Sequence, residues 1–535
     1  MLASSVRSEY PEAMALLQSL PAELIDSITT YLSLPDLRAL RLTSRELGRK
    51  ATGQYFKSFC RSKDVDLRVS DLDQLAGLLQ PGSLPASTLE DLCITGVLFV
   101  TKSLERALRQ KTVPGDWADP MGVRRDALGN SVGAKRIAVS SEEGLRRLQG
   151  ELERMRQEME ELEEDQKEGR DLIALKGLLE RVKANCGLGG LRRLRLDVVV
   201  FRDPGRMRLK PAEGAMWPDV WKIAGRTFET VVKAVAECEL GVEEFDVFGR
   251  RDSCAVQVFD LANLSDELGA FRGLKSLSLS TSNRVHLGRQ PDSMDLDPDD
   301  WDIRRRGGLV RRPDPAGNPA DESSEAHFND ERNLLGIARW LTQLPELESL
   351  DLHSTYVPEA GLDHSYPGHE PCVLRHIASQ DPRPNLKKLV LRGWSVESDI
   401  LLSLLKNSPN LQSLSLDQVA LTPPSSSWDS ILDYLSRPTT ALTYLHLNNC
   451  FTDSLRSYVR FWSGYPFRTE DTRDRGDDVH RPAAGGGNAL EIRGRETIRD
   501  GVRCRGNEKW FAGSVQQSQW RVERARAFGP MRVWD

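Results

Sequence analysis

Residues 386–391 read LKKLVL, residues 411–416 read LQSLSL and residues 442–447 read LTYLHL. All three segments follow the spacing Leu-x-x-Leu-x-Leu. The last two leucines of this hexad are separated by one residue, which is the period of a short strand with one buried face. Each hexad therefore predicts a strand. The same spacing, or a close variant of it, also begins at Leu89, Leu191, Val242, Leu274 and Leu347.

Segments with helical periodicity separate the later hexads. From Leu347 onward, the starts of successive hexads are 25 to 39 residues apart, which leaves room for one helix in each interval. The sequence therefore predicts an α/β fold in which parallel strands are joined by helices. The residues that keep helical spacing in the last two intervals are Ile400, Leu401, Leu404, Leu405, Ile431, Leu432 and Leu435.

This alternation resembles the leucine-rich repeat. The resemblance implies a solenoid whose parallel strands line a concave face and whose helices cover the convex face. The family's Asn/Cys position is Cys450 in the last copy, but it is Trp394 and Val419 in the two copies before it. In those two copies we expect water or other side chains to satisfy the backbone of the turn. The gaps between the earlier hexads exceed one repeat, so we expect an irregular solenoid interrupted by insertions.

A different pattern occupies residues 20–50, which read LPAELIDSITTYLSLPDLRALRLTSRELGRK. Leu24, Ile28 and Leu32 recur at the spacing of one helical face, and Pro21 suits the first position of a helix. Pro35 can open a second short helix, and Thr43 with Glu46 predicts a capping box for a third. About thirty residues cannot bury all of these leucines on their own, so we expect part of the apolar surface to remain available to a partner.

This block resembles the F-box. The resemblance implies that its helices bind the Skp-type adaptor of a cullin–RING ubiquitin ligase. It departs from the family pattern at Leu47 and Gly48, where many F-boxes carry a tryptophan. An ordinary N-terminal helical hairpin is the alternative interpretation. The residues expected to bind the adaptor are Leu20, Pro21, Leu24, Ile28, Leu32, Leu34, Leu37 and Leu40.

Composition restricts the remaining classes of function. The net charge is -6 and the pI is near 5.9, so nucleic acid is not an expected partner. The sequence contains no apolar run as long as a membrane span, and Glu9 and Glu12 make its start unlike a secretion signal. The eight cysteines form no Cys-x-x-Cys pair. We expect an intracellular protein, cytoplasmic or nuclear, with no membrane association and no cofactor.

One cluster has residue types that suit zinc. His364, His369, Cys372 and His376 lie within thirteen positions, and imidazole and thiolate are the usual zinc ligands. Pro367, Gly368 and Pro371 interrupt the cluster, and its ligands are more widely spaced than in common structural sites. We therefore favour a loop between two repeats and expect no metal ion there.

The pattern divides the chain into six parts. Residues 1–18 are expected to be a flexible N-terminus and residues 19–60 the F-box module. Residues 61–281 and 333–467 are expected to hold the repeats. Residues 282–332 combine aspartates, arginines and prolines and predict a disordered polyampholyte loop, although its arginine clusters could form a nuclear import signal. Residues 468–535 are expected to be a largely disordered tail.

The first block of repeats is expected to contain a charged helical insertion near residues 142–168. Its apolar residues step by three and four, as in a heptad, so the helix could form a dimer or pack its narrow stripe onto the repeats. The stripe consists of Leu145, Leu148, Leu152, Met155, Met159 and Leu162.

Together these patterns predict a non-catalytic substrate receptor of an SCF-type E3 ubiquitin ligase, which tethers an unidentified target protein near the ligase. The alternative is a protein-binding scaffold or inhibitor whose N-terminal helices only cap the solenoid. A third hypothesis, that the protein is an enzyme, has less support, because the sequence contains no nucleophile elbow and no phosphate-binding glycine loop. Target binding is assigned to polar residues of the strands, namely Lys387, Arg392, Gln412, Ser415, Thr443 and His446.

Overall fold

The computed structural model describes residues 17–113, 137–138, 141–185, 190–202, 208–209, 211, 217–249, 254–264, 267–282, 331–355, 370–380, 383, 385–422, 427–448, 450–452, 457–463, 489–499 and 502–509. The expectations for residues 1–16, for 283–330 within the polyampholyte loop, for 464–467 at the end of the repeats, and for 468–488, 500–501 and 510–535 within the tail lie outside the described residues.

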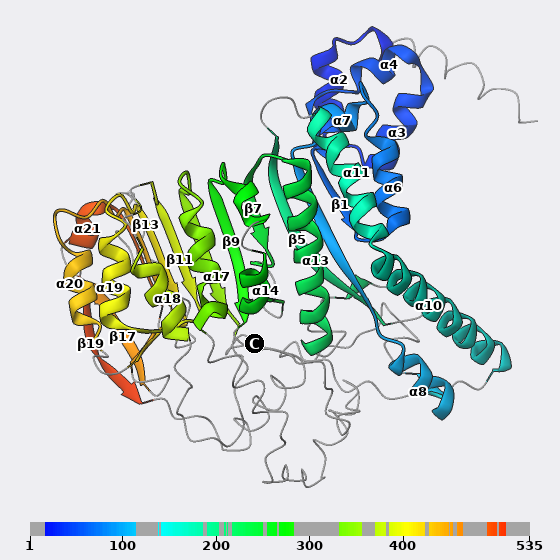
Figure 1. Ribbon diagram of the computed structural model, residues 1–535. Coiled ribbons are helices and arrows are strands. Elements are labelled where there is room, and N and C mark those ends of the chain that lie inside the picture. The colour runs from blue at the N-terminus through cyan, green and yellow to red at the C-terminus, as the bar shows by residue number, and fades with distance from the viewer. Residues whose placement is uncertain are drawn as a thin grey trace, which may run out of the picture.

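The protein has an α/β fold built on a twelve-stranded, mostly parallel sheet (Figure 1). The strands of the main path lie side by side in the order in which they occur along the chain, and all neighbours up to β15 are parallel. Every hexad leads into one of these strands, which confirms the predicted α/β class. The path consists of β1 (Ser62–Asp66), β2 (Asp91–Phe99), β5 (Leu191–Phe201), β7 (Val242–Val247), β9 (Ser276–Ser282), β10 (Ser349–Ser354), β11 (Lys388–Arg392), β13 (Ser413–Asp417), β15 (Tyr444–Asn448) and β18 (Ala489–Arg493).

Short strands supplement this path. The two-residue strands β6 (Arg208–Leu209) and β8 (Val256–Gln257) pair with β5 and β9. β3 (Thr112–Val113) and β4 (Ile137–Ala138) form a separate antiparallel pair. A second, five-stranded sheet contains β12 (Ser395–Glu397), β14 (Ala420–Thr422), β16 (Phe451–Thr452), β17 (Ser457–Ser463) and β19 (Val502–Lys509).

The leucines of the hexads fix the register of the main sheet. Leu277, Leu350, Leu389, Leu414 and Leu445 are register partners on five adjacent strands, and all five are fully buried. Burial of one leucine side chain contributes about 1.5–3 kcal/mol. A slip of one residue would turn a whole strand's leucines toward the opposite face, so this row strongly favours a single register.

Helices cover the leucine-bearing face of the sheet and lie side by side in front of it in Figure 1. Their apolar residues and the leucines of the strands form one continuous core. The opposite face, which we call the open face, carries the residues that alternate with the leucines. The covering elements are α11 (Arg170–Asn185), α13 (Trp217–Cys238), α14 (Val258–Asn263), η2 (Glu267–Phe271), α17 (Glu331–Thr342), α18 (Glu370–Ala378), α19 (Ser398–Lys406) and α20 (Asp429–Leu435).

The charged insertion forms α10 (Glu142–Glu168), which packs beside α8 (Lys102–Gln110). Its buried residues Leu148, Leu152, Met155 and Leu162 belong to one cluster with Val97, Phe99 and Val199 of β2 and β5. These strand residues lie on the open face, so α10 covers that face at the N-terminal end of the sheet. The ion pairs Arg156–Glu105 (2.8 Å) and Arg68–Glu158 (3.2 Å) hold the helix there. Its stripe is thus used within the chain, as the packing alternative predicts.

The other end of the sheet is closed by part of the segment that was expected to be a largely disordered tail. β18 pairs antiparallel with β15, and α21 (Arg495–Arg499) follows it. Ile492 and Ile498 are buried in the main core. Without β18, the edge of β15 would present unpaired backbone groups and exposed leucines. Closing this edge stabilises a segment whose composition by itself predicts disorder.

The N-terminal residues form the short helices α2 (Ala22–Thr29), α3 (Leu34–Thr43) and α4 (Arg45–Lys50), followed by α5 (Gln54–Arg61), α6 (Val69–Leu78) and α7 (Leu84–Thr88). They lie at the β1 end of the sheet (Figure 1). The cap of α4 is Ser44, whose hydroxyl accepts the Leu47 N–H at 3.1 Å. The prediction that Thr43 caps this helix is wrong, because Thr43 is the last residue of α3 and donates to the Leu40 carbonyl.

Candidate functional site

Two apolar clusters hold the N-terminal helices together. One contains Ile25, Leu47 and Ala51, with Leu20 and Leu40 partly buried against it. The other contains Leu37, Phe56 and Cys60, with Leu32, Leu34 and Leu84 partly buried against it. Leu84 belongs to α7, so the second cluster joins these helices to the segment that leads into β2. Apolar side chains of these helices that lie outside the two clusters are exposed to solvent or available to a partner.

Only part of the predicted adaptor-binding set is accessible. Leu37 is fully buried, because it packs against Phe56 and Cys60, and its assignment as a contact residue is incompatible with this structure. Leu20, Leu32, Leu34 and Leu40 are half-buried in the two clusters. Pro21, Leu24 and Ile28 are exposed. α2 turns Ile25 and Thr29 inward, so the stripe beginning at Leu24 faces outward.

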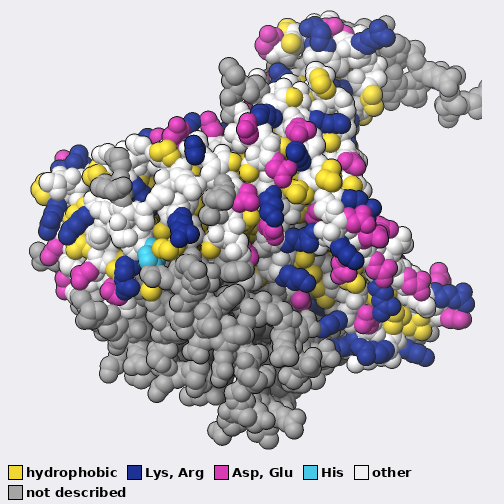
Figure 2. Space-filling view, viewed as in Figure 1, with side chains coloured by type: hydrophobic (Ala, Val, Ile, Leu, Met, Phe, Trp, Pro, Cys, Tyr) yellow, Lys and Arg dark blue, Asp and Glu magenta, His cyan; other side chains and the backbone are white. Residues whose placement is uncertain are grey.

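The exposed apolar residues form what we call the apolar surface, which consists of Leu24, Ile28, Tyr31 and Leu42. Their exposed fractions are 51%, 39%, 88% and 87%. Among the described residues, the other large apolar side chains with comparable exposure are Leu78 and Ile173. Apolar side chains are visible on the N-terminal helices at the upper right of Figure 2. Tyr31 and Leu42 were absent from the predicted contact set, although both lie within the block of residues 20–50 that resembles the F-box.

Lys50 links the two ends of this helical module. Its ammonium group donates to the carbonyl oxygens of Gln18 at 2.6 Å and Leu20 at 2.8 Å, and lies 3.3 Å from a carboxylate oxygen of Glu46. The side chain is largely shielded from solvent. Lys50 thereby holds the start of α2 against the end of α4 and helps to fix the orientation of Leu24.

The open face is the second candidate surface. Ser415 and His446 are register partners, and the row that contains them continues to Asp351 and Val390 on one side and Glu491 on the other. All five side chains are partly exposed. The structure therefore brings Ser415 and His446 together on the face that was predicted for target binding.

Arg392 lies on the same face but already has partners. Its Nε donates to Asp351 Oδ1 at 3.1 Å, and its Nη2 donates to Asp351 Oδ2 at 3.0 Å and to the Gly249 carbonyl at 2.6 Å. Burial raises the pKa of Asp351, and the positive charge of Arg392 opposes that shift. A target would have to displace this bidentate pair, so we remove Arg392 from the set of available contacts.

Lys387, Gln412 and Thr443 lie one position before their strands and are exposed at the rim of the sheet. The Lys387 ammonium pairs with Glu348 at 2.8 Å. This pair belongs to a row of alternating charge that crosses seven adjacent strands and ends before the neutral residues Gln412 and Thr443. The row, inferred from the strand registers, consists of Arg61, Glu90, Arg192, Glu243, Lys275, Glu348 and Lys387.

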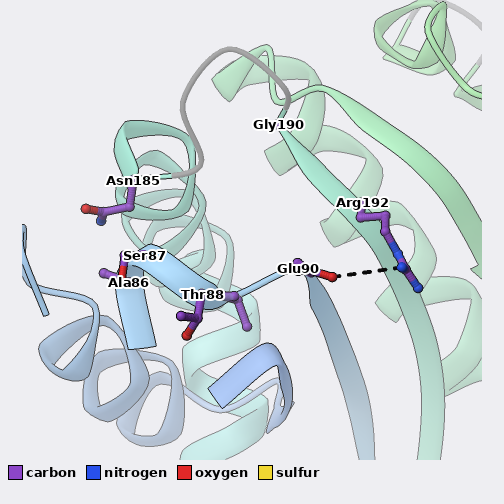
Figure 3. Close-up of a pocket in the computed structure, with 8 residues that line it drawn as sticks. Ala86, Ser87, Thr88, Glu90, Asn185, Gly190 and Arg192 are labelled. Atoms are coloured by element: carbon purple, nitrogen blue, oxygen red, sulfur yellow. Dashed lines mark ion pairs between the residues drawn. The ribbon is translucent and has the colours of Figure 1, made fainter. Parts of the chain in front are cut away.

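A shallow pocket of about 180 Å³ lies at the same rim, between α7 and the start of β5 (Figure 3). Glu90 and Arg192 face each other across one side of it, with oxygen and nitrogen 3.9 Å apart. The Ser87 and Thr88 hydroxyls donate to the Leu84 carbonyl, and the Asn185 amide donates to the Leu79 and Arg181 carbonyls. The polar groups of this pocket are thus engaged within the protein, and its described lining contains neither cysteine nor histidine.

The predicted zinc alternative falls partly outside the described residues, since His364 and His369 are not among them. Cys372 and His376 lie on α18. Within the described part of the chain, no three histidine, cysteine or carboxylate side chains are grouped so as to hold a metal ion. Nor does any helix of that part combine the length and apolarity required to cross a bilayer.

Comparisons with known proteins add no family assignment. No protein-family model matches the chain, and no curated protein matches it significantly.

Proposed function

We propose that this protein is the substrate-recognition subunit of an SCF-type ubiquitin ligase. In this proposal α2, α3 and α4 act as an F-box that binds the Skp-type adaptor, and irregular leucine-rich repeats bind a target protein. The chain contributes no catalytic group, because tethering raises the effective concentration of the target near the ligase. The sequence resemblance suggests the partner, and the exposure of the apolar surface supports a docking role for the same helices.

The observation that carries the proposal is the concentration of exposed apolar residues between positions 24 and 42. Four large apolar side chains are exposed within these nineteen positions, whereas only Leu78 and Ile173 are comparably exposed elsewhere in the described residues. Several large apolar side chains exposed on one small group of helices favour an interaction surface there. Large buried anchors account for most of the affinity of such interfaces.

The repeat assignment is supported by the register of the main sheet. Nine parallel strands follow one another in chain order, and their inward-facing apolar side chains, mostly leucines, are buried in one core. At the Asn/Cys position of the last copy, the Cys450 thiol donates to the Leu416 carbonyl at 3.7 Å. The open face between β9 and β15 offers a target partly exposed polar residues such as Ser415 and His446.

Adaptor capture by the full-length chain tests the proposal. We expect the protein to bind a purified Skp-type adaptor and the variant Leu24→Asp/Ile28→Asp to lose binding by at least about thirtyfold, since the loss of even one anchor costs about 2 kcal/mol. Leu78→Asp/Ile173→Asp is the matched control, because it places the same charges at exposed apolar positions on α6 and α11. Equal binding by both variants would refute the assignment.

The alternative of a scaffold with a helical cap retains one supporting observation. Cluster contacts between Leu37, Phe56 and Leu84 attach the N-terminal helices to the sheet, as a cap requires. A cap, however, has no need of the exposed Tyr31 and Leu42. If the chain fails to bind the adaptor while both double variants fold normally, the scaffold becomes the preferred hypothesis for the function of this protein.

A further inference from the structure

The charge around Leu42 differs from that of the chain as a whole. Residues 38–50 contain five basic residues and one acidic residue, whereas the whole chain has a net charge of -6. This concentration lies on α3 and α4, next to one end of the apolar surface. A positive site on an acidic protein indicates that its partner is recognised partly by charge.

Three of these five basic residues already have interaction partners within the N-terminal helices. Arg49 and Lys50 both pair with Glu46, at 2.9 Å and 3.3 Å, and their hydrogen bonds lower the pKa of that carboxyl. The guanidinium carbon of Arg41 lies 3.8 Å from the centre of the Phe56 ring. These contacts stabilise the helices and leave the charge of the two remaining arginines without a counterpart.

Arg38 and Arg45 are exposed, and neither has an ion pair or side-chain hydrogen bond with the described residues. Arg38 lies one helical turn before Leu42 on α3, and Arg45 is the first residue of α4, three positions after Leu42. The most exposed aliphatic side chain of the apolar surface is therefore flanked in the chain by two unpaired guanidinium groups.

From this geometry we infer that the protein that covers Leu42 does so with an apolar recess bordered by carboxylates, which pair with Arg38 and Arg45. The inference rests on the proposed function and adds the chemistry of the partner's surface. Guanidinium groups at the edge of an interface act mainly by steering the encounter, so they should raise the association rate and make it depend on salt.

Association kinetics of the full-length chain with a purified Skp-type adaptor test this inference. At low salt we expect Arg38→Glu/Arg45→Glu to slow association at least about tenfold and to abolish or reverse its decline with added potassium chloride. Arg38→Lys/Arg45→Lys should retain that decline, because it keeps the charge. The matched control is Arg147→Glu/Arg272→Glu, which makes the same change at two exposed arginines far along the chain and should alter the rate less than twofold.

The outcomes separate the two proposals. If the adaptor binds but Arg38→Glu/Arg45→Glu behaves like the control, the carboxylate-bordered partner is overturned while the docking role of Leu24 and Ile28 stands. If the unmodified chain does not bind the adaptor, the proposed function fails and this inference fails with it. Thermal unfolding of each variant verifies that the charge reversals leave the helices folded.

Discussion

Trp394 donates its indole N–H to the carbonyl oxygen of Leu352 at a distance of 3.0 Å. Trp394 is fully buried and occupies a position where a leucine-rich repeat would carry asparagine or cysteine. The sequence predicts that another group must satisfy the backbone of that turn, and the indole N–H is such a group. The bond connects the turn after β11 to β10, the preceding strand.

Replacement of Trp394 should therefore lower the free energy of unfolding by more than the smaller side chain alone would explain. We expect Trp394→Phe to lower the free energy of unfolding in urea by about 1–3 kcal/mol more than Trp340→Phe, because the Leu352 carbonyl would lose its partner in a buried setting. Trp340 is the matched control, since it is equally buried and its indole N–H has no hydrogen-bond partner among the described residues. Equal costs for the two variants would contradict a bonding role for Trp394.

Arg392 is expected to stabilise the folded protein through its pair with Asp351. Arg392→Met should lower the free energy of unfolding by about 2–3 kcal/mol, because it leaves the Asp351 carboxylate without its bidentate partner. Arg392→Lys should recover only part of this loss, since an ammonium cannot reproduce the forked geometry. Urea unfolding measures both variants, with Lys406→Met as the control, because Lys406 is exposed at the end of α19 and has no ion pair with the described residues. A change below about 0.5 kcal/mol for Arg392→Met would return Arg392 to the candidate target contacts.

Lys50 should control the local order of α2. Lys50→Met keeps most of the side-chain stem but removes the bonds to the carbonyls of Gln18 and Leu20, so we expect a loss of about 1–3 kcal/mol in local stability. Hydrogen exchange of the α2 amides should accelerate correspondingly, whereas Lys57→Met should leave it unchanged. Unaltered exchange in Lys50→Met would show that these bonds do not fix the start of the module.

Asp260 gives the protein a pH dependence with a definite sign. Burial, reinforced by the negative charge of Glu229, raises its pKa from 3.8 to about 6. The folded state therefore binds this proton more tightly than the unfolded state, and the resulting stability is complete below about pH 4 and lost as the pH rises through 6.

We expect Asp260→Asn to remove this loss and to raise the free energy of unfolding at pH 7, relative to the unmodified chain, by up to about 3 kcal/mol more than at pH 4. Urea unfolding between pH 4 and 7 measures the difference. Asp399→Asn is the control at an exposed carboxylate of α19 and should show no such trend. A constant difference between Asp260→Asn and the unmodified chain across this range would exclude Asp260 as the source.

The local patterns predicted the elements well because each pattern belongs to a single element. The hexads locate the strands, since alternation of apolar residues requires no knowledge of the neighbouring strand. The stripe from Leu145 to Leu162 predicted a helix, and α10 spans Glu142–Glu168. The same patterns did not predict β18, because its order comes from pairing with β15 and from burial of Ile492 rather than from its own composition.

The sequence by itself thus determined where the hexad strands and the helices of residues 20–50 lie and that apolar residues recur along α2. Only the tertiary structure decided which of those residues remain accessible. Leu24 and Ile25 are equally apolar neighbours, yet Ile25 is buried against Leu47 while Leu24 is exposed. Likewise, Arg392 is engaged by Asp351, forty-one positions away. Exposure depends on contacts between segments distant in the chain, whereas periodicity is a property of one segment.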